Sequence, residues 1–336
     1  MIADVEIAPD TIVEKLIKND VKSAAPFFIT QDSAMLEILM KIRLIANSRA
    51  SVFITGESGT GKEVIASLIH YYGDDRRRPF IAINSAALPK DVVDNELFGH
   101  EKEAFTGAVS KKEGCFELAH NGILFLDEIV EMHPQTQAKL LRAIESKSIR
   151  RLGGREEIKV DTRIIAATNR DLQASLKSGD LREDLFYRLS VIEIHIPSLR
   201  ERKEDIPLLV KHFLSLLTQK YGGIEKRFSD ECMEMMKEFN WPGNIRELRN
   251  VVERVLLTCS DEIITPQYLP ERISGHAAVC QYIKIPIGVT MNIAEQMLID
   301  QTLASVQNNI SAAARILGLS RKTIHNKLNE RRTGLC

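Results

Sequence analysis

The spacing of hydrophobic residues along this 336-residue chain changes in a way that divides it into regions. Up to about residue 198, short apolar or β-branched runs alternate with stretches of helical period. The runs at 51–55, 80–83, 123–126 and 163–168 are predicted strands. Because strands that alternate with helices form a mostly parallel sheet covered on both faces, the pattern predicts an α/β fold.

Beyond residue 200 the pattern becomes wholly helical, and it is then interrupted by prolines and glycines. We expect an α/β subdomain over 27–200 and a helical lid over 201–272. A linker over 273–290 and a final all-helical unit over 291–336 follow. Residues 1–26 lack a clear period and are expected to be a leader or linker, too short for a sensory domain.

Composition adds that the chain is an ordinary globular protein, with 44% hydrophobic and 27% charged residues. Its five cysteines are odd in number and contain no CxxC pair, which argues against a disulfide framework or a zinc site. The chain start has no apolar signal core, and no run reaches the length of a membrane span. We therefore expect a cytoplasmic protein.

The near-neutral net charge of -1 is the sum of a basic carboxyl-terminal end and an acidic remainder. Residues 308–336 contain six basic residues and one acid, about +5, so the rest of the chain sums to about -6. This distribution suits a DNA-binding module attached to an acidic body, although a solubilising tail has the same composition.

A glycine-rich segment follows the first predicted strand and opens a helix; it reads Gly56-Glu57-Ser58-Gly59-Thr60-Gly61-Lys62. In this context it predicts an ATP phosphate-binding loop, whose amide groups hold the β-phosphate while Lys62 reaches the β- and γ-phosphates. Glu63 stands where many such loops place the Ser or Thr that ligates Mg²⁺. Another oxygen must then hold the metal.

Two acids, Asp127 and Glu128, come directly after the apolar strand at 123–126. Ligands of parallel α/β sheets bind at the carboxyl ends of the strands, so we expect Asp127 to hold Mg²⁺ directly or through water. Glu128 is then placed to activate the water that attacks the γ-phosphate. The alternative interpretation is a solvated turn.

With these motifs, the segment Glu103-Ala104-Phe105-Thr106-Gly107-Ala108 gives the chain, from about 28 to 328, a resemblance to a known family. It resembles the AAA+ P-loop domains of sigma-54-dependent bacterial enhancer-binding activators. Their loop reads Gly-Ala-Phe-Thr-Gly-Ala and touches the sigma factor. Here Glu103 replaces the first glycine, which disfavours positive φ and adds a negative charge at the contact. An ordinary turn with Phe105 packed inward is the alternative.

The resemblance implies further roles. Asn84 is expected to hold Glu128, Asn169 to act as the first sensor of the γ-phosphate, and Arg246 as the second sensor on the lid. Arg182 and Arg188 resemble arginine fingers that act on a neighbouring subunit. Six residues apart on one helix, they would point about 120° apart.

Local patterns around these residues lead to two more expectations. Asn244 is expected to cap a lid helix, with Glu247 reaching back in a capping box. The alternative interpretation of Arg188 is a surface i,i+4 ion pair with Asp184 and no catalytic role.

The basic end predicts two short helices around Gly318, with Ser311 and Ser320 as N-caps and with Ile324 and Leu328 on the buried face. It resembles a Fis-type helix-turn-helix, in which a preceding helix, here about 293–306, supports dimer pairing at palindromic sites. A solvated helical hairpin is the alternative. The residues left to face double-stranded DNA are Arg321, Lys322, Thr323, His325, Asn326 and Lys327.

Together these features favour a DNA-bound activator whose subunits, from dimer to hexameric ring, use ATP hydrolysis to remodel the closed complex of sigma-54 RNA polymerase holoenzyme. One competing hypothesis is a regulator that binds nucleotide and DNA but does not remodel sigma-54, because Glu103 alters the contact loop. Another is an AAA+ motor that remodels DNA.

Overall fold

The computed structural model describes residues 28–73, 77–105, 108–222, 226–274, 288–305 and 309–332. The chain divides into two compact units, Met1–Ser274 and Gly275–Cys336. The leader expected over 1–26 lies outside the described residues, as does most of the linker expected over 273–290.

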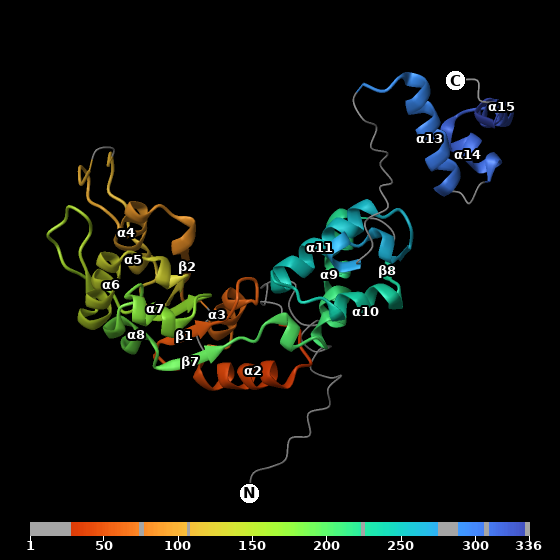
Figure 1. The fold of residues 1–336 in the computed structure, drawn as a ribbon. Coiled ribbons are helices and arrows are strands. Elements are labelled where there is room, and N and C mark those ends of the chain that lie inside the picture. Colours follow the sequence, from red (N-terminus) through yellow and green to blue (C-terminus); the bar gives the residue numbers. More distant parts are fainter. Residues whose placement is uncertain are drawn as a thin grey trace, which may run out of the picture. The chain divides into compact units, whose positions relative to one another are not determined.

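The first unit is built on a five-stranded parallel sheet with the order β2-β3-β6-β1-β7 (Figure 1). The four predicted strands are confirmed. The fifth, β7, was not among them, although its alternating isoleucines carried the signal. The strands are β1 (Val52–Thr55), β2 (Phe80–Asn84), β3 (Ile123–Asp127), β6 (Arg163–Thr168) and β7 (Ile192–His195).

Both faces of this sheet are buried, which confirms the α/β fold. Along β3, Leu124 and Leu126 belong to one hydrophobic core, while Ile123 and Phe125 belong to another on the opposite face. The helices are α2 (Ser33–Ile45) and α3 (Lys62–Tyr71) on the second core, and α4 (Lys90–Phe98), α5 (Cys115–Leu118), α6 (Pro134–Ser146), α7 (Leu172–Ser178) and α8 (Glu183–Leu189) on the first.

A helical lid follows the sheet in the same unit. Trp241 is fully buried at its centre, and the indole donates a hydrogen bond to the Met236 carbonyl (2.6 Å). Its elements are α9 (Asp205–Tyr221), α10 (Asp230–Glu238), α11 (Asn244–Thr258), α12 (Glu271–Ser274) and the short paired strands β8 (Arg227–Phe228) and β9 (Ile263–Ile264). A small antiparallel hairpin, β4 (Ser148–Ile149) with β5 (Ile158–Lys159), lies between α6 and β6.

The second unit contains α13 (Met291–Ser305), α14 (Ile310–Leu317) and α15 (Arg321–Arg332). Its core includes Ile299, Ala313 and Ile324. Gly318 takes a left-handed φ of 66° between α14 and α15, which a turn between two short helices requires. The pattern of two helices around this glycine is therefore present.

The two predicted N-caps of this unit differ in outcome. Ser320 accepts a hydrogen bond from the Thr323 amide (3.1 Å), as expected. Ser311 lies inside the first turn of α14, and Asn309 accepts from the Ser311 amide instead (3.1 Å), so that prediction was wrong by two residues.

Two global expectations concern membranes and cysteines. Within the described residues, every helix is too short or too polar to cross a bilayer. Cys115, Cys232 and Cys259 are free thiols. Cys280 and Cys336 lie outside the described residues.

Candidate functional site

The glycine-rich loop lies between β1 and α3 and begins the helix at Lys62, as the motif predicts. Gly56, Gly59 and Gly61 all have positive φ. At Gly59 a side chain is sterically excluded, because a Cβ atom there would lie 2.4 Å from the Gly243 carbonyl oxygen of the lid. The glycines thus serve both the turn and the close approach of the lid.

Lys62 and the two acids meet at the carboxyl edge of the sheet. Lys62 Nζ is almost fully buried and lies 3.3 Å from Glu128 Oε1, and it also donates to the Gly56 carbonyl (3.0 Å). Glu128 has a left-handed backbone, φ 54°, and its Oε2 accepts from the Asn169 backbone amide (2.9 Å). The predicted base and the predicted phosphate-binding lysine therefore form one ion pair.

The side-chain amide of Asn84 hydrogen-bonds to Asp127 and not to Glu128, so the expected pairing was wrong. Its Nδ2 donates to Asp127 Oδ2 (2.8 Å), while its Oδ1 accepts from the amides of Ala86 and Ala87. The sheet register explains this, because β2 and β3 place Asn84 directly opposite Asp127. Asn84 is thus a cap that also orients the first acid.

The electrostatics of Asp127 suit a cation. Burial, and secondly the neighbouring Glu128 carboxylate, raise the pKa of Asp127 above its usual range. Its Oδ1 is buried and has no hydrogen-bond partner in the described part of the chain. An unpaired buried carboxylate oxygen beside a second acid is the arrangement that a divalent cation would complete.

These groups line a cavity of about 900 Å³ between the sheet edge and the lid. The loop contributes Ser58 through Glu63, and the lid contributes Arg246 and several side chains of α9 and α11. Arg246 Nη1 donates to Ser58 Oγ (3.0 Å), so this second-sensor candidate faces the phosphate loop.

The expected capping role of Asn244 was wrong. Asn244 is fully buried, its backbone is left-handed, and its side chain contacts Glu57, Ser58 and Leu199 rather than its own helix. Glu247 does reach back, but to the Gly243 amide (2.8 Å). The local sequence suggested a cap because asparagine is common at helix N-termini. The true partners could not be read from it, since they lie more than 40 residues away along the chain.

Sequence reasoning also missed Arg200, which forms a two-pronged ion pair with Glu57 (2.5 and 2.9 Å). This pair is the main reason that the pKa of Glu57 is lowered. No local motif surrounds Arg200, so only the tertiary structure identifies it.

The arginine-finger segment has a different shape from the expected straight helix. Arg182 precedes α8 with an extended backbone and pairs with Asp184 (2.7 and 3.0 Å), so the 120° relation does not apply. This pair also replaces the one considered between Asp184 and Arg188. Arg188 is exposed and has no ion-pair partner among the described residues.

The loop that begins at Glu103 closes on itself through a hydrogen bond from the Glu103 amide to the Ala108 carbonyl (2.9 Å). Glu103 adopts φ 66°, although its side chain disfavours that conformation. Phe105 is 46% exposed and touches the His100 ring, with centroids 5.1 Å apart. Thr106 and Gly107 lie outside the described residues.

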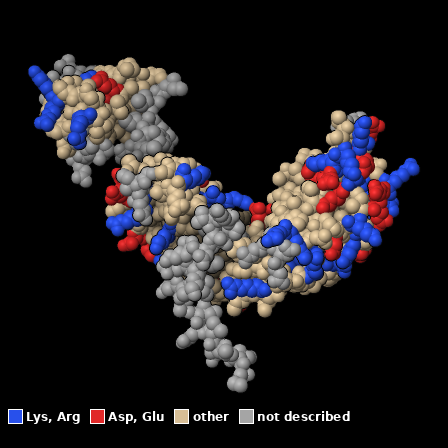
Figure 2. Space-filling model, turned by 180° about the vertical axis from the view of Figure 1, so that it is seen from behind, with Lys and Arg blue, Asp and Glu red and all other residues tan. Residues whose placement is uncertain are grey.

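On α15, Arg321, Lys322 and His325 are exposed, and Thr323 is half-buried against Ser320. Lys327 forms an ion pair with Glu295 of α13. Figure 2 shows lysine and arginine side chains projecting from this unit. The side chains of Asn326 and Leu328 lie outside the described part of the structure.

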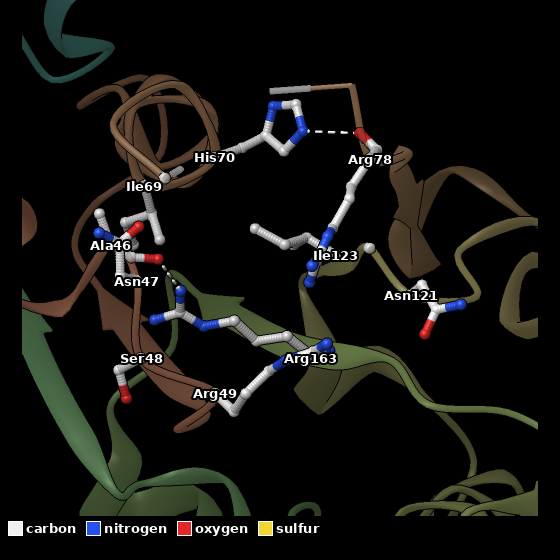
Figure 3. Close-up of a pocket in the computed structure, with 12 residues that line it drawn as sticks. Ala46, Asn47, Ser48, Arg49, Ile69, His70, Arg78, Asn121, Ile123 and Arg163 are labelled. Carbon is white, nitrogen blue, oxygen red and sulfur yellow. Dashed lines mark hydrogen bonds between the residues drawn. The ribbon is translucent and has the colours of Figure 1, made fainter. Parts of the chain in front are cut away.

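A second, smaller cavity of about 260 Å³ lies at the amino-terminal edge of the sheet (Figure 3). Its central residue, Arg163, is buried, and its guanidinium donates to the carbonyls of Ile45, Ala46 and Ala50 (2.7–2.9 Å). Arg163 therefore caps the carboxyl end of α2, so we assign this cavity a structural role.

Comparisons with known proteins match three family models to successive parts of the chain. The chain matches the model of the sigma-54 interaction domain over residues 28–195, of the AAA+ ATPase lid domain over 200–281, and of the bacterial regulatory protein, Fis family, over 290–330. It is 46% identical over 313 residues to the regulatory protein AtoC of Escherichia coli, covering 90% of this chain and 67% of that protein.

Two further relatives are similar over most of the chain. The transcriptional regulator NtrC of Azospirillum brasilense is 39% identical over 331 residues, covering 90% of this chain and 69% of NtrC. The crystal structure of NtrX from Brucella abortus in complex with ATP has a TM-score of 0.68 at 33% identity, covering 95% of this chain and 71% of that one.

Proposed function

The chain belongs to the family of sigma-54-dependent transcription activators with an AAA+ domain and a Fis-type DNA-binding domain, and on this premise we propose that it hydrolyses ATP to remodel sigma-54 RNA polymerase. The observation that carries the proposal is the ion pair between Lys62 and Glu128 inside the cavity, 3.3 Å apart. It brings a phosphate-binding cation and a general base to one point.

In this mechanism the loop from Gly56 to Thr60 cradles the β-phosphate with its amides and the amino end of α3. The γ-phosphate competes for Lys62, so that Glu128 is released to accept a proton from the attacking water. The Asn169 amide, 2.9 Å from Glu128 Oε2, keeps that carboxylate aimed during the exchange.

Asp127 would hold Mg²⁺, directly or through water, since its Oδ1 is buried and without a partner among the described residues. The ion would supply charge neutralisation to the β- and γ-phosphates. Asn84 donates to the other carboxylate oxygen of Asp127 (2.8 Å), so Oδ1 would be available to the ion. Glu63 lines the same cavity and is a second oxygen donor.

Arginines complete the site from the lid and from a second subunit. Arg246 approaches the phosphates from the lid, where it contacts Ser58. Exposed Arg188 and, at the start of the same segment, Arg182 are our candidates to reach the γ-phosphate of a neighbouring subunit in a ring, a hexamer by family resemblance. Charge that develops in phosphoryl transfer gives these cations their effect.

The proposed output runs from the loop of Glu103 to Ala108 to the sigma factor, with half-exposed Phe105 as the apolar anchor. The second unit would hold the assembly on DNA near the promoter. There Arg321, Lys322, Thr323, His325 and Asn326 are our candidates for the duplex. Lys327 would have to leave Glu295 in order to join them.

The test is ATP turnover by the full chain over a concentration series, compared with the Glu128→Gln variant, which keeps the size of the side chain but not the base. Turnover per subunit should rise with concentration as rings form, and it should fall at least a hundredfold in the variant, about what a general base contributes. Adding sigma-54 holoenzyme on a premelted promoter should give ATP-dependent opening.

Two outcomes would redirect the assignment. Turnover without promoter opening would favour the regulator that binds nucleotide and DNA without remodelling sigma-54. An unchanged rate in Glu128→Gln would refute Glu128 as the base.

A further inference from the structure

Three consecutive carbonyl groups of the phosphate-binding loop are held by the lid and the segment that leads into it. Each accepts one hydrogen bond of 3.0 Å, and the three donors are a buried amide side chain, a backbone N–H and a buried guanidinium. The pairs are Asn244 Nδ2 to the Ser58 oxygen, Ile245 N–H to the Gly59 oxygen, and Arg202 Nη2 to the Thr60 oxygen.

These contacts determine where the loop's amides point. In a trans peptide unit the C=O of one residue and the N–H of the next point in opposite directions in one plane. Pulling the oxygens of Ser58 and Thr60 toward the lid therefore turns the N–H groups of Gly59 and Gly61 away from it. Thr60 N–H closes the loop internally by donating to Glu57 O (3.4 Å).

Asn244 is the central residue of this contact. It is fully buried, and its Oδ1 accepts from the Leu199 amide (2.8 Å) while its Nδ2 serves the Ser58 oxygen and Glu57 Oε2 (3.1 Å). Its backbone has φ 51°. A buried residue in a left-handed conformation whose side chain bonds outside its own helix is held there by tertiary contacts.

The ion pair between Arg200 and Glu57 supports the position of Asn244. Arg200 binds both oxygens of Glu57, and Glu57 Oε2 in turn accepts from Asn244. The chain entering the lid, the first turn of α11 and the phosphate loop are thereby joined in one hydrogen-bonded network.

We propose that Asn244 is a positioning residue through which the lid sets the conformation of the phosphate-binding loop, so that lid position controls nucleotide affinity. The inference rests on the proposed function, because it concerns the same nucleotide site. It extends that function, because Asn244 touches neither phosphate nor water in the mechanism above and acts through the Ser58 carbonyl.

The test uses the full-length chain with Asn244→Asp, which keeps the acceptor for Leu199 and tolerates positive φ but cannot donate to Ser58. We expect the Kd for ADP, from calorimetry, and the KM for ATP to rise about tenfold, with kcat changed less than about twofold. A residue that merely supported folding would instead lower the melting temperature and the active fraction. Asn244→Gly, which accepts the same backbone, should give the same rise if the aspartate variant folds poorly.

The matched control is Asn121→Asp, since Asn121 also has a left-handed backbone (φ 61°) but lines the second cavity (Figure 3). It should leave the Kd for ADP unchanged. In the double variant Glu57→Gln/Asn244→Asp, the glutamine amide can donate to the aspartate, which restores a hydrogen bond between positions 57 and 244. The Ser58 carbonyl still has no donor, so the raised Kd for ADP should persist.

Unchanged nucleotide affinity in a folded Asn244→Asp protein would overturn the inference, and so would full recovery in the double variant. If the wild-type chain bound ADP but did not hydrolyse ATP, the proposed activity would fail. The ADP affinities would still decide the role of Asn244.

Discussion

Replacing Glu103 with glycine should strengthen the loop that we assign to the sigma factor. A non-glycine residue at φ 66° costs roughly 1–2 kcal/mol. The side chain gives little in return, because it is 82% exposed and its only ion pair among the described residues, with Lys102, is long (3.6 Å) and on the surface. Glycine removes the strain, at an entropic cost of about 0.5–1 kcal/mol.

The net expectation is a stabilisation of about 0.8 kcal/mol, the difference between the midpoints of these two ranges. For a unit of this size that corresponds to roughly 1–4 °C in a calorimetric melting temperature. Removing the carboxylate should also increase promoter opening at equal ATP turnover. Glu103→Ala keeps the strain but removes the charge, so it separates the two effects.

The control is Lys147→Gly, another exposed charged residue in a left-handed conformation (φ 51°), at the carboxyl end of α6. Because Lys147 also donates to Asp161 (3.2 Å) in a surface ion pair, the variant should stabilise somewhat less than Glu103→Gly, and it should not affect promoter opening. A lower melting temperature for Glu103→Gly would refute the strain argument. Equal opening by wild type, Glu103→Ala and Glu103→Gly would refute the view that Glu103 hinders the contact.

Two further predictions concern stability. Arg163→Met should lower the free energy of unfolding in urea by about 3 kcal/mol, because one buried and two part-buried carbonyls at and just beyond the end of α2 lose their donor; a loss below 1 kcal/mol would contradict the capping role. Burial lowers the pKa of His212, so the unfolded chain binds the proton more readily: stability should be full above the unfolded pKa of about 6.5 and fall as the pH drops toward the folded pKa. His212→Gln should flatten that part of the stability profile, and an unchanged slope would exclude His212 as its cause.

The sequence sufficed where chemistry is carried by consecutive residues. The phosphate loop and the acids Asp127 and Glu128 are local patterns, and a strand before each fixes where they must lie. The fold class followed in the same way from the alternation of strands and helices. Strand β7 could also have been predicted from the sequence, because isoleucines alternate with polar residues at Ile192, Ile194 and Ile196.

The sequence did not determine which hydrogen-bond partner a given side chain takes. Asn84 was assigned to Glu128, but one residue of register decides between Glu128 and Asp127, and register is a property of the paired strands. Asn244 looked like a helix cap because asparagine is common there. Its real partners come from two distant segments that only the folded chain brings together.

Residues with a left-handed backbone occur at several of the positions to which we assign a function. Among the described residues, six that are not glycine have positive φ, and three of them are Glu103, Glu128 and Asn244. They lie in the loop proposed to contact the sigma factor, at the proposed base and at the contact between lid and phosphate loop. At Glu128 and Asn244 glycine would relieve the strain but remove the carboxylate or amide that the site requires. At Glu103 we assign the side chain no such task, and for that reason it is the position where we expect glycine to improve the protein.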